Sequence, residues 1–462
     1  MRRPKYRLTK DVIQIDGRNL YRIQAVVNHP DLKDGVSSAK NLMRKPKINI
    51  GKVYAVGGCV RDYILGLPEN DVDYVIVGST EDEMESSGFA KVGKSFPVYL
   101  DDEGYEYALA RTEVKSGHGY DGFTTNVNGV TLEEDLKRRD LTINSICYDF
   151  ETNEYIDPLG GIKDLENGIL RMSNQAAFVE DPLRVLRLAR FNSRFDSFTI
   201  DTVTKCAIVY DIPDKITEFK SISAERIKLE FEKMWNQCSD PSIFFRVLYS
   251  LGVLEIITPE ISNLRRVIEN PAHHPEGNTF EHTMLALKKA KEMNLDVDCM
   301  WIILTHDFGK YLTRDTYSHL HHDTDGVEIV EGFCNRLRLT SVQTAFCKLF
   351  CEQHMRLHKL RVMKSFKVAD LFDKCRVYHT RDIIEKIAEC GIADIMGREK
   401  EGDIPFSMDE VGAYVEAYRK ISGNDVIKLF GDREKPIPKG DEFQHQLKIL
   451  RGIEITRCRR KL

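Results

Sequence analysis

Hydrophobic and polar positions follow different periods in the two halves of the chain. Between about residues 52 and 150, short apolar runs with the two-residue period of strands are separated by turns. These runs lie at 53–56, 73–77, 96–100 and 146–150. Beyond residue 180, apolar residues recur at helical spacing, as in the stripe of Ile227, Phe231 and Met234. The pattern predicts the α+β class, with a small α+β head followed by a long α-helical body.

The two ends of the chain are less informative. Residues 1–50 contain a predicted hairpin, with strands at 12–15 and 20–27 around the turn Asp16-Gly17. The last residues, 457–461, are rich in arginine and lysine and suit either contact with RNA or a solvated tail, of which we favour the tail.

Composition narrows the classes of protein to which this chain can belong. The 462 residues, 42% of them hydrophobic, suffice for several ordinary domain cores. No apolar stretch approaches the length of a membrane span, and no signal core opens the chain, so we expect a cytoplasmic protein without membrane contact. The eleven cysteines form no CxxC pair, which indicates reduced, buried thiols. A net charge of −5 argues against nonspecific coating of nucleic acid but permits a local basic surface.

The densest candidate chemistry lies between the first two predicted strands. The sequence GGCVRD places Gly57 and Gly58 in a tight turn, where backbone N–H groups can approach a phosphate. Asp71 and Asp73 are two residues apart at the start of the next strand, so their carboxylates share one face. Metal-binding carboxylates beside a phosphate-binding turn are what two-metal phosphoryl transfer requires. The alternative is a strand end with solvated acids after a tight turn.

Two further segments are rich in arginine or glycine. In RRDLTIN, Arg138 and Arg139 offer planar guanidinium forks that suit a triphosphate, although a solvated basic turn has the same composition. The segment DPLGGIKD, residues 157–164, is typical of a bend, and we expect Asp164 to cap the next helix.

The segment EDPLRVLRLARF predicts a helix that carries a basic stripe. Asp181 and Pro182 are expected at its N-cap and its first helical position. Arg184, Arg187 and Arg190 recur every three residues and therefore spread over roughly a third of the circumference. Such a stripe is usually the solvated face of a helix, while the leucines between the arginines supply the buried face.

The motifs GGCVRD with DVD, RRDLTIN, DPLGGIKDL, EDPLRVLRLARF and AERIKLE resemble, in order and spacing, those of class II tRNA nucleotidyltransferases. These are the CCA-adding enzymes, whose heads belong to the polymerase β-like superfamily. The resemblance covers residues 52–240 and is strongest to bacterial multifunctional enzymes with a C-terminal HD domain. It implies template-independent addition and repair of the 3′-terminal CCA of tRNA with CTP, ATP and Mg²⁺. It also implies the tRNA 3′ end as a partner, and we expect a homodimer.

The resemblance assigns roles to residues of the head. Asp71 and Asp73 would hold two magnesium ions that bind the triphosphate and activate the RNA 3′-hydroxyl. The nucleotide would be contacted by Gly58 and Arg61, and its phosphates and sugar held by Arg139, Arg187 and Arg190. Residues 111–126 match the flexible loop near the active site of the family.

Asp181 and Arg184 match the amino-acid template for the base in this family. Cytosine and adenine both present an exocyclic amine donor next to a ring-nitrogen acceptor. A carboxylate accepts from the amine and a guanidinium donates to the ring nitrogen, whereas guanine and uracil present the reverse order. Mispairing would leave buried polar groups without hydrogen bonds, which gives strong rejection of GTP and UTP.

Residues 276–400 resemble HD metal-dependent phosphohydrolases. The resemblance rests on His282, the dipeptide His306-Asp307 after an apolar helical run, and a distant Asp394. Mixed imidazole and carboxylate ligands suit a transition metal. Three further histidines, His319, His322 and His354, are expected to line the pocket. Relatives hydrolyse 2′,3′-cyclic phosphates, 2′-nucleotides and phosphate monoesters, with Ni²⁺ favoured for phosphatase action.

The predicted organisation has five parts. They are an N-terminal extension at 1–50, a nucleotidyltransferase head at 51–178, a helical neck and body at 179–275, an HD domain at 276–400 and a helical C-terminal segment at 401–462. Two alternatives are a poly(A) polymerase of the same superfamily and an HD phosphohydrolase whose head only binds RNA. Polymerases of that kind typically carry a strongly basic C-terminal extension and no intact HD set, whereas this chain shows the opposite. A head that only binds RNA needs no paired metal carboxylates, so Asp71 and Asp73 argue against the second alternative.

Overall fold

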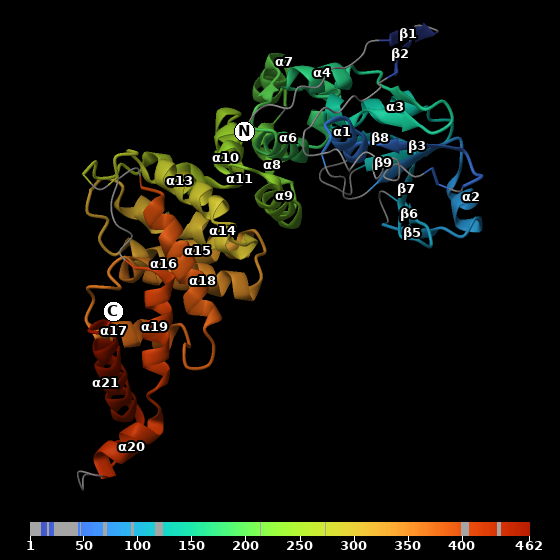
Figure 1. Cartoon of the computed structure of the whole chain (residues 1–462). Helices are drawn as coiled ribbons and strands as arrows, with labels where there is room; N and C mark the ends of the chain where they lie inside the picture. Colours follow the sequence, from blue (N-terminus) through green and yellow to red (C-terminus); the bar gives the residue numbers. More distant parts are fainter. Residues whose placement is uncertain are drawn as a thin grey trace. The chain divides into compact units, whose positions relative to one another are not determined.

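The structure is a computed structural model that describes residues 11–15, 18–22, 45–46, 48–67, 72–93, 97–115, 123–212, 214–272, 274–398, 406–431 and 436–462. The chain divides into two compact units, Met1–Ser223 and Ala224–Leu462, each of which we describe by itself (Figure 1). The first unit contains a sheet flanked by helices, and the described elements of the second are helices. The predicted α+β class with a helical body is therefore confirmed.

The first unit is built on a nine-stranded mixed sheet in the order β1-β2-β11-β10-β3-β4-β7-β6-β5. Its strands are β1 Asp11–Ile15, β2 Arg18–Arg22, β3 Lys52–Val56, β4 Asp73–Val77, β5 Ala90–Val92, β6 Val98–Leu100, β7 Glu106–Leu109, β10 Cys147–Asp149 and β11 Glu154–Ile156. Strand β3 pairs antiparallel with β4 and β10, and β4 pairs parallel with β7. Tyr74, Val75 and Ile76 of β4 are buried on both faces, which explains their unbroken apolar run. All four predicted strands are present, as β3, β4, β6 and β10.

The predicted N-terminal hairpin is also present, and it extends this sheet. Strands β1 and β2 pair antiparallel, with Asp11 opposite Arg22. Strand β2 then pairs with β11, where Tyr21 lies opposite Tyr155. The hairpin is therefore one edge of the sheet, and the predicted continuation to residue 27 lies outside the described residues.

Short helices and two small ladders cover the sheet of the first unit. The helices are α1 Gly58–Ile64, α2 Glu81–Ser86, α3 Leu132–Lys137, η2 Thr142–Asn144, α4 Gly161–Asn167, α5 Gln175–Glu180, α6 Leu183–Arg194, α7 Thr202–Cys206, η3 Ala207–Asp211 and α8 Lys215–Lys220. The ladders pair β8 Thr112–Lys115 with β9 Phe123–Asn126, and β12 Ile169–Leu170 with β13 Thr199–Ile200. Strands β8 and β9 bound the loop expected at 111–126, of which residues 116–122 lie outside the described part.

The prediction that Asp164 in the segment 157–164 caps a helix is wrong. Asp157, not Asp164, accepts the backbone N–H groups of Gly161 and Ile162, at 2.8 and 2.9 Å. Asp164 lies inside α4 and accepts hydrogen bonds from Thr142 and Arg171. The segment is structural, as expected, but Asp164 cannot cap this helix because the helix begins three residues before it.

Helix α6 begins at Leu183, one residue later than predicted. Pro182 already has helical dihedrals, while Asp181 is extended and its Oδ1 accepts the N–H of Leu183 at 3.2 Å. The arginine stripe is not a solvated face, because Arg184 and Arg190 are buried together with the leucines. The contacts that bury the stripe come from the segments that carry the other arginine and glycine motifs.

The second unit is a bundle of helices. They are α9 Ala224–Gln237, α10 Ser242–Ser250, α11 Leu254–Ile257, α12 Pro259–Asn263, η4 Leu264–Arg266, α13 Thr279–Glu292, α14 Val297–Thr305, η5 Phe308–Thr313, α15 His322–Arg336, α16 Ser341–Leu357, α17 Ser365–Lys374, α18 Asp382–Met396, α19 Met408–Arg419, α20 Gly423–Gly431 and α21 Gly440–Arg459. Helix α14 lies at the centre, where it packs against α13, α16 and α18. Its Trp301 stacks on Phe231 of α9, one of the three residues of the predicted stripe, all of which are buried. Within the described ranges, no helix is long and apolar enough to cross a membrane.

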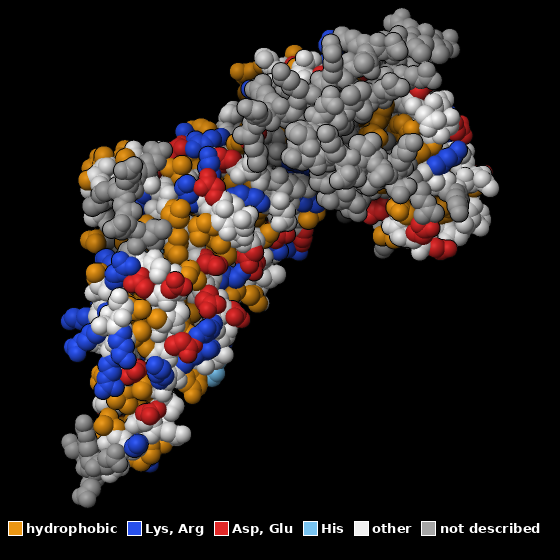
Figure 2. Space-filling model, viewed as in Figure 1, with side chains coloured by type: hydrophobic (Ala, Val, Ile, Leu, Met, Phe, Trp, Pro, Cys, Tyr) orange, Lys and Arg blue, Asp and Glu red, His pale blue; other side chains and the backbone are white. Residues whose placement is uncertain are grey.

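The C-terminal residues form a helix rather than a tail. Helix α21 runs to Arg459, whose guanidinium donates to the carbonyl oxygens of Met363 and Leu360 at 2.6 and 2.5 Å. Figure 2 shows Lys and Arg side chains gathered over α17 and the end of α21, with a few acids among them. Arg457, Arg460 and Lys461 are exposed there, so the basic end of the chain is a structured, solvated surface.

A contact between two glycines positions the HD dipeptide. Gly309 of η5 packs on Gly326 of α15, and a Cβ on Gly309 would lie 2.0 Å from the carbonyl oxygen of His322. A Cβ on Gly326 would lie 3.0 Å from the Cα of Gly309. The backbones therefore touch, and this contact fixes the distance between His306-Asp307 and the start of α15.

We therefore expect Gly309→Ala to destabilise the second unit by about 1–3 kcal/mol, because the added methyl group overlaps backbone that cannot move aside. The measurement is urea unfolding followed by tryptophan fluorescence, since both tryptophans, Trp235 and Trp301, lie in this unit. The matched control is Gly332→Ala in α15, where a Cβ meets no atom within 4 Å. That substitution should be neutral or stabilise by up to about 1 kcal/mol. Equal effects of the two substitutions would contradict the packing argument.

Candidate active sites

The first candidate site lies where β3 ends and β4 begins. Gly57 follows β3 with φ +82°, and a Cβ there would lie 3.2 Å from Nη1 of Arg139 and 4.0 Å from Oδ2 of Asp73. The turn is therefore glycine both for its left-handed backbone and for the close approach of these groups. Asp73 is exposed as the first residue of β4, while Asp71 lies outside the described residues. The structure thus places Gly57, Asp73 and Arg139 together, as the sequence predicted.

A buried carboxylate that sequence reasoning missed holds the two arginines of RRDLTIN. Asp135 lies 2.5 Å from Nη2 of Arg138 and 3.0 Å from Nη2 of Arg139. Burial alone would raise the pKa of Asp135, but the two guanidiniums outweigh it and lower the pKa to about 2. The only sequence signal was the spacing, since residues three and four apart on a helix face each other.

Asp140 joins the same segment to the arginine stripe. Its Oδ2 lies 2.8 Å from Nε of Arg187, and its Oδ1 accepts from the Asn144 side chain at 2.9 Å. Oδ1 of Asn144 in turn accepts from Arg61 at 2.5 Å. Burial opposes ionisation of Asp140, but Arg187 and Asn144 hold its pKa far below the usual range. One buried carboxylate therefore sets the positions of two predicted nucleotide-binding arginines.

The remaining predicted head residues lie around the same arginines. Arg184 donates through Nη1 to the carbonyl oxygens of Arg138 and Arg139, at 2.5 and 3.2 Å. The Arg190 guanidinium lies 4.3 Å from the ring centroid of Phe191, and that of Arg61 lies 5.0 Å from the same ring. Gly58 lies one turn before Arg61, and a Cβ there would be 3.6 Å from Nη2 of Arg61. Arg61 also pairs with Asp62, which accepts from Arg194 at 2.9 Å.

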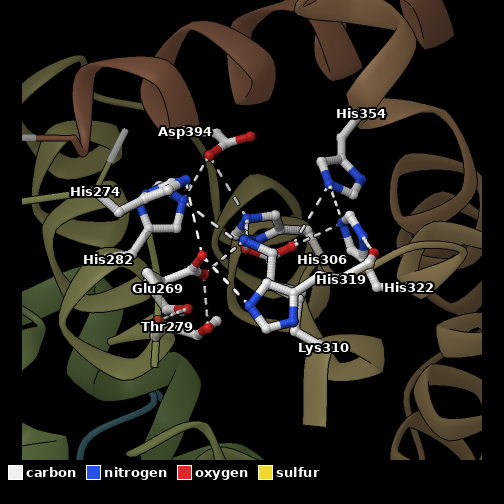
Figure 3. Close-up of polar contacts among 12 residues, drawn as sticks. Glu269, His274, Thr279, His282, His306, Lys310, His319, His322, His354 and Asp394 are labelled. Carbon is white, nitrogen blue, oxygen red and sulfur yellow. Dashed lines mark hydrogen bonds and ion pairs between the residues drawn. The ribbon is translucent and has the colours of Figure 1, made fainter. Parts of the chain in front are cut away.

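The second candidate site lies in the second unit and contains all four predicted HD residues. Nε2 of His282, on α13, lies 2.8 Å from Oδ1 of Asp394, on α18. His306 follows α14, and its Nε2 lies 3.0 Å from Oδ2 of Asp307 and 3.6 Å from Oδ1 of Asp394. All four are at most 1% exposed. We call these residues the first HD cluster (Figure 3).

His319, His322 and His354 line the same site, as predicted (Figure 3). His322 and His354 approach Oδ1 of Asp307 to 3.4 and 3.5 Å and each other to 3.2 Å. We call Asp307, His322 and His354 the second HD cluster. His319 lies on the other side of Lys310, 3.6 Å from Oε2 of Glu269.

Four further residues complete the site and were not predicted. Oε1 of Glu276 lies 3.1 Å from Nδ1 of His282, and Nε2 of His358 lies 2.7 Å from Oδ2 of Asp394. Lys310 lies 2.8 Å from both Asp307 and Glu269. Glu269 and Glu276 belong to no recognised motif, whereas His358 follows His354 by four residues at the end of α16, a helical spacing that could have marked it. Lys310 follows the HD dipeptide by three residues, which is a usable but weak signal.

The charges of this site are strongly coupled. Burial alone would lower the pKa of His306, but Asp307 and Asp394 outweigh it and raise the pKa to about 10. Burial opposes ionisation of Asp307 and Asp394, but the histidines around both and Lys310 beside Asp307 hold their pKa values well below the usual range. Burial lowers the pKa of His358 to about 4, so that imidazole is neutral at pH 7. Ionised acids therefore face imidazoles throughout the site.

The first HD cluster fits a divalent transition metal. It offers two imidazole nitrogens and two carboxylates, the donor set that such ions prefer. Among the described residues, Nε2 of His306 makes no hydrogen bond despite its burial, because it faces the carboxylates without hydrogen-bond orientation. Glu276 orients His282 from behind, as carboxylates commonly do for metal-bound histidines.

Three family models match successive parts of the chain. They describe a poly A polymerase head domain over residues 53–171, a probable RNA- and SrmB-binding site of polymerase A over 197–264, and an HD domain over 279–394. The fold and the two sites thus define a nucleotidyltransferase joined to a metal-dependent HD phosphohydrolase.

Curated relatives define the family more narrowly. A multifunctional CCA protein of Shewanella denitrificans is 39% identical over 424 residues, covering 89% of this chain and 98% of the relative. That of Haemophilus influenzae is 37% identical over 388 residues, covering 81% and 92%. The chain therefore belongs to the family of multifunctional CCA proteins, and it is a CCA tRNA nucleotidyltransferase with an HD phosphohydrolase domain.

Solved structures share the fold. An apo CCA-adding enzyme is 21% identical with a TM-score of 0.58, and the match covers 88% of this chain and 90% of that enzyme's chain. The Bacillus stearothermophilus CCA-adding enzyme in complex with CTP is 22% identical with a TM-score of 0.57, over 87% and 88%. The Thermotoga maritima enzyme complexed with tRNA is 19% identical with a TM-score of 0.54, over 87% of both chains.

We expect Asp135→Asn to destabilise the first unit by about 3–5 kcal/mol at pH 7, because it leaves two guanidiniums without their buried partner. The folded pKa of about 2 lies below the ordinary value of 3.8, so this carboxylate stabilises the fold above about pH 4. That contribution, about 2 kcal/mol, is lost as the pH falls toward 2. Chemical unfolding between pH 7 and pH 3 should show the variant and wild type converging. A difference that stays constant over this range would refute the assignment.

Proposed function

We propose that the head adds C, C and A in turn to the 3′ end of tRNA, using CTP and ATP. The observation that carries the proposal is the 39% identity to a multifunctional CCA protein over almost the whole of that protein. It is supported by the clustering of Gly57, Asp73, Arg139 and the Asp140 network at one place in the first unit. Solved relatives that bind CTP, ATP and tRNA share the fold.

Asp71 and Asp73 would hold Mg²⁺, which supplies charge neutralisation for the triphosphate when bound. The carboxylate of Asp73 is exposed beside Arg139, so it is accessible to an ion and to a phosphate. Arg139, Arg187 and Arg190 would bind the phosphates and the sugar, while Gly58 and Arg61 would contact the nucleotide. Asp135 and Asp140 hold three of these guanidiniums in place before substrate arrives, which lowers the entropic cost of binding.

Asp181 and Arg184 would select the base. One oxygen of Asp181 accepts the N–H of Leu183, and a carboxylate has lone pairs for a further donor such as the base amine. Arg184 is anchored through Nη1 to the carbonyl oxygens of Arg138 and Arg139, which fixes the direction of its fork. An acceptor and a donor held three residues apart at the start of α6 would thus accept C or A and reject G or U.

The HD unit would hydrolyse phosphate esters at RNA ends, namely 2′,3′-cyclic phosphates, 2′-nucleotides and phosphate monoesters. The first HD cluster supplies the donor set for a transition metal, of which we propose Ni²⁺. Lys310 lies between Asp307 and Glu269, and its ammonium group would attract a phosphate. We further propose a cytoplasmic enzyme, supported by eleven free cysteines, and a homodimer, which rests on the family resemblance.

The product pattern on tRNA that ends at the discriminator base tests the first activity. CTP alone should extend the RNA by two residues, ATP alone should not extend it, and both together should give CCA. Extension by ATP alone into a long tract would favour the poly(A) polymerase alternative. Asp71→Ala with Asp73→Ala should abolish addition, because the charge of the triphosphate then lacks its metal ligands.

The same assays separate the two sites. The Asp71→Ala, Asp73→Ala double variant should hydrolyse a 2′,3′-cyclic phosphate at the wild-type rate. His306→Ala should lose this hydrolysis and keep the addition of CCA. Loss of both activities in either variant would indicate misfolding or a shared site. Continued hydrolysis by His306→Ala would remove the HD unit from the proposal.

Arg184→Ala should relax the choice of base more than it weakens nucleotide binding. One hydrogen bond from a charged donor contributes about 1.5–3 kcal/mol, so CTP and ATP should lose roughly ten- to hundred-fold of their advantage over UTP and GTP. Arg187→Ala is the matched control, since it removes the partner of Asp140 and should weaken all four nucleotides alike. The measurement is single-turnover incorporation of each nucleotide. A common factor for all four with Arg184→Ala would make this residue a scaffold contact only.

A further inference from the structure

The two carboxylate oxygens of Asp394 face different partners. Oδ1 lies 2.8 Å from Nε2 of His282 and 3.6 Å from Nε2 of His306, the two imidazole nitrogens of the first HD cluster. Figure 3 shows this oxygen turned toward both rings. Oδ2 lies 2.7 Å from Nε2 of His358, the residue that follows α16. The side chain of Asp394 is only 1% exposed, so these side chains, and not solvent, determine how the carboxylate is held.

Arg398 determines which nitrogen of His358 carries the proton. Nη2 of Arg398 lies 3.0 Å from Nδ1 of His358. A guanidinium can only donate, so this Nδ1 accepts and holds no proton. The proton of the neutral ring therefore lies on Nε2, which donates to Oδ2 of Asp394. The three side chains thus form one chain of hydrogen bonds, directed from Arg398 through His358 to Asp394.

Two other histidines of the site have the opposite arrangement. Nδ1 of His306 lies 2.7 Å from the carbonyl oxygen of Ile303, and Nδ1 of His354, one helical turn before His358, lies 2.8 Å from that of Cys351. A carbonyl oxygen can only accept, so in the neutral rings each of these Nδ1 atoms carries the proton and Nε2 presents a lone pair. Nε2 of His358 carries a proton and has no lone pair to offer a metal ion. His358 is therefore a hydrogen-bond donor to the site and not a ligand.

Close packing of two helices holds Arg398 in place. Gly397 precedes it at the end of α18, and a Cβ on this glycine would lie 2.6 Å from the backbone nitrogen of Ala286 in α13. The chain thus leaves α18 in direct contact with the helix that carries His282. Among the described residues, Nε of Arg398 is buried and makes no hydrogen bond. The guanidinium is oriented to satisfy Nδ1 of His358 while its own Nε lacks an acceptor, an arrangement that calls for a functional explanation.

We propose that His358 and Arg398 are positioning residues for the first HD cluster. The proposal rests on the proposed HD function, in which that cluster binds a transition-metal ion. His358 holds Oδ2 of Asp394 by a hydrogen bond, so that Oδ1 stays directed at the ion. Arg398 acts through His358, because it keeps the ring in the tautomer that donates to the carboxylate. Removing a hydrogen-bond partner of a metal ligand typically lowers metal affinity by about 10- to 100-fold.

The test is the affinity of the full chain for Ni²⁺, measured by competition with a chelating dye. The Asp71→Ala, Asp73→Ala double variant serves as the parent protein, so that the predicted metal ligands of the head do not contribute. His358→Ala should weaken Ni²⁺ binding by about 10- to 100-fold, because Asp394 loses the donor that holds it. His358→Gln should recover most of this loss, since its amide nitrogen can donate in place of Nε2.

A double-mutant cycle tests whether Arg398 acts through His358. Arg398→Ala should weaken Ni²⁺ binding in the parent protein, although by less than His358→Ala, because Asp394 by itself still favours the donor tautomer. In the His358→Ala background the same substitution should cause no further loss. Equal losses in the two backgrounds would show that Arg398 acts by another route and would overturn its assignment.

The control is His379→Ala, an exposed histidine outside the site, which should leave the affinity unchanged. Circular dichroism monitors folding, and His358→Asn, whose amide is too short to reach Asp394, replaces His358→Ala if that variant unfolds. If His358→Gln loses as much affinity as His358→Ala, His358 is itself a ligand and the proposal is refuted. If neither substitution weakens binding while His306→Ala does, the positioning role is refuted and the metal site stands. If His306→Ala also binds Ni²⁺ as the parent does, the proposed HD function fails and the proposal fails with it.

Discussion

A charged group can be buried only with a partner, and both sites of this protein are built on that constraint. In the head, Asp135 and Asp140 hold the arginines of three separate motifs against one another. In the HD unit, Asp307 and Asp394 are surrounded by imidazoles and one lysine. Removing either set of acids would leave uncompensated charges in the interior, so the geometry of the sites and the stability of the fold depend on the same contacts.

The arginine stripe of α6 illustrates what this constraint changes. A row of arginines at every third position of a helix suggests a face toward water, because long charged side chains are seldom buried. Here Arg184 and Arg190 are buried, and Arg184 and Arg187 donate to the carbonyl oxygens of Arg138 and Arg139 and to the carboxylate of Asp140. The helix is thus the element through which the separate motifs of the head contact one another.

Local patterns in the sequence predicted much of this molecule. The strand that begins with Asp73, the strand that Gly57 follows and the helical body follow from spacing, and the four residues of the first HD cluster follow from motifs. What the sequence did not predict depends on pairs of residues far apart along the chain. Glu276 stands outside any motif, and the four-residue spacing of His354 and His358 identifies no partner on another helix, so only the fold places Glu276 beside His282 and His358 beside Asp394. That Asp157 caps the helix in place of Asp164 has a similar origin, since a short turn offers several acids and packing decides which one caps the helix.

The acids of the HD pocket have a consequence for the charge of the ligand that it accepts. Within the described residues, four carboxylates, Asp307, Asp394, Glu269 and Glu276, face one ammonium group, Lys310, and one guanidinium, Arg398, which donates to His358. Metal binding requires neutral imidazoles, and in that state the side chains of the pocket carry a net charge of −2, which would repel a phosphate dianion. One divalent ion brings this charge to zero, so a bound ion would remove the repulsion. In electrostatic terms, the bound ion determines whether the pocket rejects or tolerates a phosphate ester.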